Sequence, residues 1–147
     1  MDERLELGTR LGADIVINSA KENVIKAIYE VTGGMGADAA CETSGSAVAQ
    51  ANLVDALKYG GRGVFVGFGA QGPSITVSSF IGKQLVLMGS FVMPINYYWD
   101  LTEFIILHGL STRYQQMITH RFKLTEAAEA FKVADAAKSG KVVFSWS

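Results

Sequence analysis

The chain has 147 residues, 49% of them hydrophobic and 18% charged, with a net charge of −1. It can therefore bury a sizeable core, but it has no electrostatic footprint for nucleic acid or an anionic membrane, and no apolar run long enough to predict a membrane span or a signal peptide. The lone Cys41 excludes an internal disulfide and indicates a reducing compartment, so we expect a cytoplasmic protein.

Strands and helices are predicted to alternate through the first part of the chain. Apolar residues recur at helical spacing in some segments, while short apolar runs bounded by turn residues predict strands. The expected elements are a helix over residues 2–11, a buried strand over 14–18, a helix over about 22–31 begun by a capping box of Ser19 and Glu22, a strand over 37–42, and a helix over about 47–58.

The alternation continues through the rest of the chain. A strand entered and left through glycines is predicted over residues 60–69. The elements expected after it are a short extended piece over 75–77, a strand over 84–90, a helix capped by Asn96 with Leu101, Phe104, Ile105 and His108 on its inward face, a last helix capped by Thr125, and a closing strand over 141–144.

This alternation favours an α/β fold with parallel strands and right-handed crossovers. Ligands bind beyond the carboxyl ends of the strands in such sheets, and three of the four ends contain glycine. Glycine there either lets a planar ring or a sugar approach the backbone closely or simply forms the turn, and both readings remain open. The four ends are Asn18, residues 43–45, residues 67–69 and residues 88–90.

One glycine motif has the spacing of a dinucleotide-binding loop. Gly67, Gly69 and Gly72 match G-x-G-x-x-G, but that fingerprint needs a helix immediately after the loop to hold the pyrophosphate. Residues 73–77 predict extended chain instead. We therefore interpret the segment as a late strand of a nucleotide-binding sheet whose glycine-lined end is open to a ligand.

A series of short phrases recurs in a recognisable order over nearly the whole chain. They are Arg4-Leu5-Glu6-Leu7, Leu11-Gly12-Ala13-Asp14, VTGGMGAD at 31–38, Glu42-Thr43-Ser44-Gly45, Gly60-Gly61-Arg62, Val66-Gly67, Gly89-Ser90-Phe91, ITHRF at 118–122 and SGKVV at 139–143. Each phrase is weak alone. Their order and spacing resemble the cofactor domain of medium-chain zinc-dependent alcohol dehydrogenases, especially the threonine and sorbitol dehydrogenase-like members.

The resemblance implies which residues would bind a nicotinamide dinucleotide, NAD or NADP. Arg4 matches a basic residue that reaches the adenosine ribose and Lys141 matches one near the pyrophosphate, although a solvated surface charge explains either equally well. The other implied positions are Thr43, Ser44 and Gly45 beside the ribose and adenine, the backbone of Val66, Gly67 and Phe68 facing the nicotinamide, and the backbone of Val86, Leu87 and Met88 holding the carboxamide.

The resemblance also implies that the family's glycine fingerprint, its ribose-binding acid and its zinc-binding catalytic domain would precede Met1. We therefore expect no catalytic residue and no zinc site in this chain. Catalytic zinc needs three converging ligands, whereas the candidate ligands lie far apart in sequence. We interpret Cys41 as a small buried hydrophobe, His108 as a core histidine and His120 as structural, and Glu42 has no evident partner.

The expected fold is a single domain over residues 1–147, a three-layer α/β structure. Its Rossmann-like parallel sheet is incomplete, because it lacks the first two strands of the order 3-2-1-4-5-6. If the strand over 14–18 pairs directly with that over 37–42, helices gather on one face and the other exposes apolar sheet. Alternatively a second chain supplies the cover. Either outcome predicts a homo-oligomer, with the resemblance implying a dimer through residues 75–77 and 84–88.

Two functions compete on this basis. The chain is either the C-terminal nucleotide-domain portion of an NAD(P)-dependent alcohol or polyol dehydrogenase, inactive alone, or a non-catalytic module for weak nucleotide binding or oligomer assembly. A small enzyme built on the glycine loop ranks third. Neither nucleic acid nor membrane is expected as a partner.

Overall fold

The computed structural model describes residues 2–69 and 75–146, which fall into two compact units. One unit consists of residues 21–95. The other, here called the terminal unit, consists of the described residues up to 20 and from 96 onward. Each unit is described by itself, and the expectation of a single domain stays a prediction.

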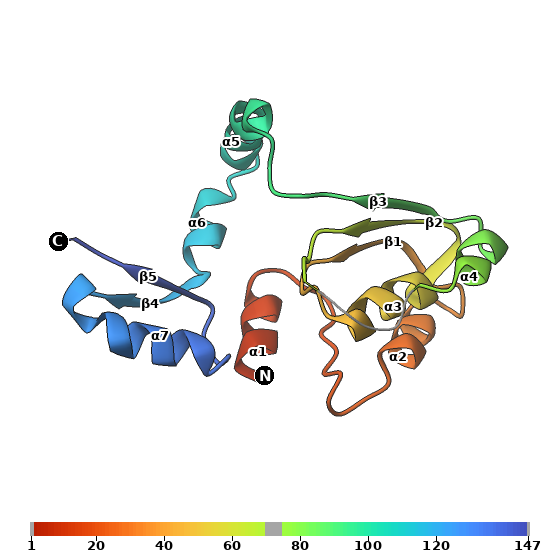
Figure 1. Ribbon diagram of the computed structural model, residues 1–147, viewed down its shortest axis with the longest axis horizontal. Helices are drawn as coiled ribbons and strands as arrows, with labels where there is room; N and C mark the ends of the chain where they lie inside the picture. The colour runs from red at the N-terminus through yellow and green to blue at the C-terminus, as the bar shows by residue number, and fades with distance from the viewer. Residues whose placement is uncertain (1, 70–74, 147) are drawn as a thin grey trace. The chain divides into compact units, whose positions relative to one another are not determined.

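The 21–95 unit is built on a three-stranded parallel sheet of order β1-β2-β3 (Figure 1). This order corresponds to the last three strands of the sheet order anticipated from the sequence, so the predicted α/β class with an incomplete parallel sheet is confirmed. The elements are α2 (Val24–Val31), β1 (Ala37–Glu42), α3 (Ala47–Ala56), β2 (Leu57–Phe65), α4 (Val77–Gly82) and β3 (Val86–Gly89).

The three strands end at the same level. Glu42 lies opposite Phe65, and Phe65 lies opposite Gly89, so the residues that follow each strand emerge at one edge of the sheet. Ser90 N donates to Phe65 O at 2.8 Å and extends the ladder beyond β3. Parallel α/β sheets bind their ligands at this edge.

The core of the 21–95 unit lies between the sheet and its helices. Val54 and Leu57 are 2% and 0% exposed, and Leu53 and Leu85 complete the buried cluster. Figure 1 shows α2, α3 and α4 on the same side of the sheet, as right-handed crossovers between strands added in one direction require.

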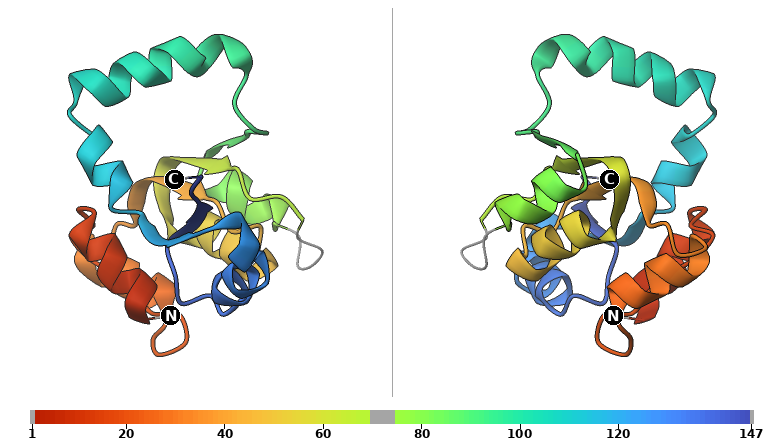
Figure 2. Two further views of the ribbon diagram at one scale, coloured as in Figure 1. Left: turned by 90° about the vertical axis from the view of Figure 1, so that its left-hand side faces the viewer. Right: turned by 90° about the vertical axis from the view of Figure 1, so that its right-hand side faces the viewer.

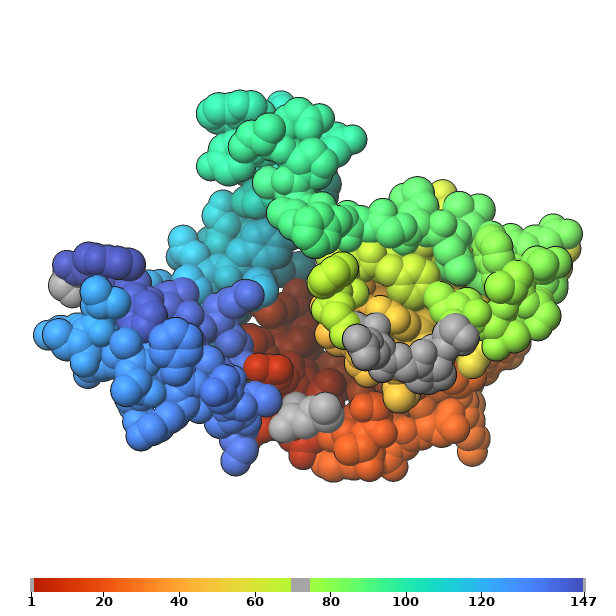
Figure 3. Space-filling model, in the orientation of Figure 1, coloured from red at the N-terminus to blue at the C-terminus, as the bar shows by residue number. Residues whose placement is uncertain are grey.

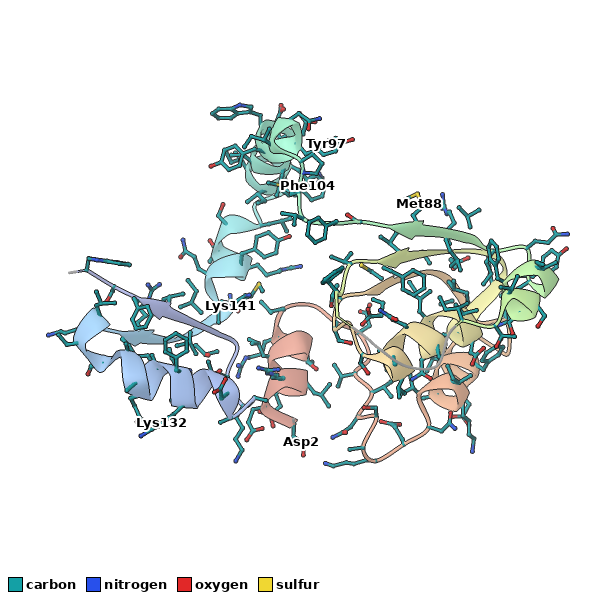
Figure 4. The ribbon with its side chains drawn as sticks, in the orientation of Figure 1. Asp2, Met88, Tyr97, Phe104, Lys132 and Lys141 are labelled. Carbon is teal, nitrogen blue, oxygen red and sulfur yellow. The ribbon has the colours of Figure 1, made fainter. Side chains whose placement is uncertain are left out.

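The opposite face of this sheet is open and apolar. The strand register places Cys41, Val64 and Met88 in one row across the three strands. Val86 is 53% exposed and Met88 is 59% exposed, and Figure 4 shows Met88 pointing away from the helices. Apolar sheet is thus exposed on one face, although the pairing of residues 14–18 with residues 37–42 from which we expected this exposure does not form.

The terminal unit contains a two-stranded parallel sheet, in which β4 (Ile118–Phe122) pairs with β5 (Lys141–Phe144). Helix α7 (Ala127–Asp135) packs against β5 and buries Ala130. Leu7 of α1 is also buried, at 8% exposure. The remaining elements are α1 (Asp2–Arg10), η1 (Ile95–Tyr97), α5 (Tyr98–Leu107), α6 (Ser111–Gln115) and η2 (Leu124–Glu126).

Two expectations near the start of the chain are wrong. Residues 14–18 form no strand, and Ile15 is 57% exposed, because this segment belongs to the terminal unit and pairs with neither β4 nor β5 there. Asn18 fixes it instead, accepting a hydrogen bond from Ala20 N at 3.0 Å. Asn23, rather than the predicted pair of Ser19 and Glu22, caps α2 through a bond from Lys26 N at 2.9 Å.

Helix α5 departs most from its predicted burial. Its apolar spacing predicts an inward face, yet Leu101 is 42% exposed and Phe104 is 51% exposed. Figure 2 shows η1 and α5 as one continuous helical stretch, and neither has a buried residue. The helical period is present, but the described residues provide no surface that covers it. None of the helices within residues 2–69 and 75–146 is long and apolar enough to span a bilayer.

Candidate functional site

Glu42, the last residue of β1, organises the turn that follows it. The residue is 5% exposed, and its carboxylate accepts hydrogen bonds from Ser44 Oγ at 2.5 Å, from Ser44 N at 2.7 Å and from Gly45 N at 3.0 Å. A buried carboxylate is strongly destabilising unless such donors surround it. The strand residue and the turn therefore stabilise each other.

The same residue joins this turn to the end of β2. The Glu42 carbonyl oxygen accepts hydrogen bonds from Val66 N at 2.8 Å and from Gly67 N at 3.0 Å. Gly45 has a φ of +71°, and a Cβ there would lie 2.7 Å from Phe68 O. A Cβ at Gly67 would overlap Gly45 N and lie 2.7 Å from Glu42 Oε2. The two loops interlock only because both positions are glycine.

Six of the residues implied by the resemblance thus come together at the carboxyl edge of the sheet. The loop after β2 continues to Phe68, which is 87% exposed and packs edge-on against Phe91 with ring centroids 5.7 Å apart. Figure 3 shows the residues that follow β2 beside those that follow β3. The six are Thr43, Ser44, Gly45, Val66, Gly67 and Phe68.

Val86 and Met88 lie inside β3, not in the loops. They pair with Arg62 and Val64 of β2, and both side chains are exposed. Met88 precedes Gly89, the last residue of β3, so its backbone is next to the ligand-binding edge. A contact from these two residues to a carboxamide stays a prediction.

The other two predicted residues line a hollow of about 380 Å³ in the terminal unit. Arg4 Nε donates to the carbonyl oxygen of Ser139 at 2.9 Å, and Ser139 is 2% exposed. This bond fixes the arginine through one of its five N–H donors. Lys141 begins β5, where its backbone N donates to Met117 O at 2.6 Å (Figure 4). Two cations at one hollow suit a phosphate or another anion.

Sequence reasoning missed the role of Glu42, because it treated the residue as a strand carboxylate without a partner. The local signal was present in the sequence. A carboxylate at the end of a strand, followed by Ser44 and Gly45, places an acceptor within reach of the donors of its own turn. The sequence predicted this turn at the ligand-binding edge without any knowledge of the hydrogen bonds of Glu42.

The candidate metal ligands are exposed, which corrects two expectations. Cys41 lies on the open face of the sheet, and His108 is exposed with its ring 4.4 Å from that of Phe104. His120 is exposed too, with Nδ1 2.9 Å from Thr119 Oγ1. Within the described residues no three His, Cys, Asp or Glu side chains gather to hold a metal ion, so these residues do not fit a zinc site.

The G-x-G-x-x-G motif is only partly described. Gly67 and Gly69 follow β2, and Gly72 lies outside the described residues. Of the extended piece predicted over 75–77, Thr76 is extended, but Val77 already begins α4. That helix has six residues and does not follow the motif immediately, as a pyrophosphate loop requires.

Comparison with known proteins gives one consistent family. The profile of the zinc-binding dehydrogenase family matches residues 1–106. The L-threonine 3-dehydrogenase of Saccharopolyspora erythraea is 31% identical over 146 residues, which are 99% of this chain and 42% of that protein. The L-threonine 3-dehydrogenase of Escherichia fergusonii is 31% identical over 143 residues, 97% of this chain and 41% of that protein. This chain thus spans less than half the length of these relatives.

Solved structures show the same likeness. An alcohol dehydrogenase of Thermotoga maritima has a TM-score of 0.82 at 27% identity, covering 98% of this chain and 40% of that one. For a short chain alcohol dehydrogenase of E. coli CFT073 complexed with NADH, the TM-score is 0.82 at 21% identity, over 99% of this chain and 42% of that one, which shows the fold alone. Since the family profile covers more than half of its residues, this chain belongs to the zinc-binding dehydrogenase family.

Proposed function

We propose that this chain is the C-terminal, nicotinamide-nucleotide-binding portion of a zinc-type alcohol or polyol dehydrogenase, and that alone it binds NAD or NADP without turnover. The observation that carries the proposal is the interlock of residues 43–45 with residues 66–68 at the carboxyl edge of a parallel sheet. The dehydrogenase names of the relatives support an oxidoreductase role for the protein to which this chain contributes.

Each unit, taken by itself, contains residue types that suit a chemical group present in a nucleotide. In the 21–95 unit, Gly45 and Gly67 leave their backbones accessible to a planar ring or a sugar, and Ser44 adds a hydroxyl. In the terminal unit, Arg4 and Lys141 supply cations at a hollow. Guanidinium and ammonium groups are the usual protein partners of phosphate oxygens.

The chemistry assigned to this chain is binding and orientation. When bound, the nicotinamide ring supplies the carbon that exchanges a hydride with the substrate. The backbone after β2 would lie against that ring, and the exposed Phe68 would exclude water from one side of it. The described residues do not fit zinc, so we assign no zinc-dependent step to this chain.

Calorimetric titration with NADH and NADPH tests this function, combined with dehydrogenase assays on alcohols, polyols and L-threonine. We expect heat of binding from at least one nucleotide and no turnover with any substrate. Turnover by the isolated chain would contradict the proposal that the chain alone is inactive. Absence of binding by both nucleotides would overturn the nucleotide-binding part.

A second candidate function is oligomer assembly, and the open face of the 21–95 unit favours it. The occupant we propose is a second copy of this chain, paired through the edge strand β3. An edge strand carries unpaired backbone groups, and the apolar side chains near it are exposed: Val86 53%, Met88 59%, Phe91 76% and Val92 72%. A stable interface needs about 800 Å² per partner, and each aromatic can supply up to about 150–250 Å².

Sedimentation equilibrium at micromolar concentration distinguishes this assembly from a monomer. Met88→Lys places like charges on both copies at the proposed contact, so we expect it to convert a dimer into monomers. Ile106→Lys is the control, because Ile106 is 67% exposed and apolar but lies on α5. A monomeric parent chain, or a dimer that Met88→Lys leaves intact, would contradict the proposal.

A further inference from the structure

We propose that Glu42 is a positioning residue for the nucleotide. Its buried carboxylate sets the conformation of the turn over residues 43–45 and, through that turn, the spacing to the loop over residues 66–68. The effect on the nucleotide rests on the function proposed above. The effect on the two loops is a property of the chain without any ligand.

The hydrogen bonds of Glu42 fix the turn from one side. Ser44 Oγ donates to the carboxylate and also accepts from Ser46 N at 3.1 Å. Ser46 is the N-cap residue of α3, and its own side chain makes no capping bond. The carboxylate therefore holds both the turn and, through Ser44, the N-cap residue of the helix that follows.

Hydrogen bonds and close contacts couple the two loops, so neither loop can move without the other. Glu42 contributes its carboxylate to one loop and its carbonyl oxygen to the other, which begins at Val66 and Gly67. The position of a Gly67 Cβ is already occupied by atoms of Gly45 and by Glu42 Oε2. A change in the side chain at position 42 must therefore be transmitted to the backbone facing the nucleotide.

The site requires a carboxylate rather than any polar group of the same shape. An ionised carboxylate only accepts. Its Oε1 receives Ser44 N, Ser44 Oγ and Gly45 N, and its Oε2 shares Gly45 N at 3.2 Å. A glutamine that keeps its oxygen at the Oε1 position places its N–H₂ group at the Oε2 position, against the N–H of Gly45. Glu42→Gln therefore keeps the volume, but it removes the charge and replaces the second acceptor by a donor.

The test compares Glu42→Gln with Asp38→Asn in the full chain. Both variants exchange a carboxylate for an amide in β1, but Asp38 is exposed and pairs with Lys58 outside the turn. We measure residue-specific amide hydrogen exchange by NMR without ligand, and NADH affinity by calorimetry. For Glu42→Gln we expect the Ser44, Gly45 and Gly67 amides to exchange about tenfold faster or more, and NADH to bind about tenfold more weakly. Asp38→Asn should change neither.

Ser44→Ala removes one of the donors and should give smaller changes in the same direction, so it carries the test if Glu42→Gln fails to fold. Unchanged exchange at Gly45 and Gly67 would overturn the inference. Faster exchange with unchanged NADH affinity would overturn the positioning role. If the parent chain binds no NADH, the proposed function fails, while the exchange data still decide whether Glu42 sets the two loops.

Discussion

The ammonium of Lys83 lies 2.7 Å from the carbonyl oxygen of Asp55, near the last residue of α3. It also lies 3.0 Å from Leu57 O and 3.3 Å from Val54 O. Helix α3 passes directly into β2, so the carbonyl groups at its end lack helical donors. Lys83 supplies the missing donors and places a positive charge at the negative end of the helix.

Replacing Lys83 by methionine should therefore destabilise the chain. The variant keeps most of the side-chain volume but leaves the partly buried carbonyl groups without their donor, and we expect a loss of about 1.5–3 kcal/mol in the free energy of unfolding. Urea denaturation measures it. The control is Lys26→Met, because Lys26 is exposed on α2 and its ammonium lies 3.7 Å from the carboxylate of Glu30, so it should change stability by less than about 0.5 kcal/mol. Equal effects of the two variants would contradict the role of Lys83.

A methyl group at Gly45 should disrupt the interlocked loops. The φ of +71° and the 2.7 Å approach to Phe68 O both disfavour it, and we expect Gly45→Ala to lower stability by about 1–3 kcal/mol. Gly89→Ala is the matched control at the end of a neighbouring strand. No atom lies within 4 Å of the position its Cβ would take, so it should stay within about 0.5 kcal/mol of the parent. A Gly45→Ala chain as stable as Gly89→Ala would show that the loops can separate.

The elements predicted best from the sequence are those whose pattern is local. The strands over 37–42 and 141–144 have the predicted bounds, because apolar residues bounded by glycine define them without reference to the rest of the chain. The segment over 14–18 has the composition of a strand but no neighbour to pair with, and a strand depends on that neighbour. The residue pattern within the segment does not show whether a neighbouring strand will pair with it.

The candidate site, like the fold, was predicted from the sequence only in part. The loops over 43–45 and 66–68 follow from the rule that ligands bind at the carboxyl ends of parallel strands, and the chain brings them together. The partners of Glu42 could have been inferred from the adjacent Ser44 and Gly45. Those of Lys83 could not, because 28 residues separate it from Asp55. Helical spacing predicts an apolar face on α5, but it does not show whether another surface packs against that face, so the exposure of α5 could not be predicted.

Asp38 makes a small, pH-dependent contribution to stability. The hydrogen bond and charge of Lys58 lower the pKa of Asp38 below its usual value. A lowered folded-state pKa stabilises the chain at pH values above the unfolded pKa, about 3.9, and this contribution is lost as the pH falls through the folded-state pKa. We therefore expect Asp38→Asn to be slightly less stable than the parent near pH 7, with the difference disappearing as the pH falls through the folded-state pKa of Asp38.

Urea denaturation of the parent and Asp38→Asn at several pH values measures this difference. Because both partners are partly or fully exposed, high salt should reduce the difference at neutral pH. A difference that grows as the solution is acidified would reverse the expected sign. It would mean that folding raises the pKa of Asp38 instead of lowering it.

Lys141 gives the most direct test of anion binding in the terminal unit. Lys141 lines the same hollow as Arg4, so Lys141→Gln should weaken NADH binding by about tenfold and reduce the dependence of the affinity on salt. Lys132→Gln is the control, because Lys132 is exposed on α7, where it lies 3.7 Å from Glu129. Calorimetry at low and high salt compares the two. Equal weakening by both variants would mean that general positive charge, rather than the hollow at Arg4 and Lys141, attracts the nucleotide.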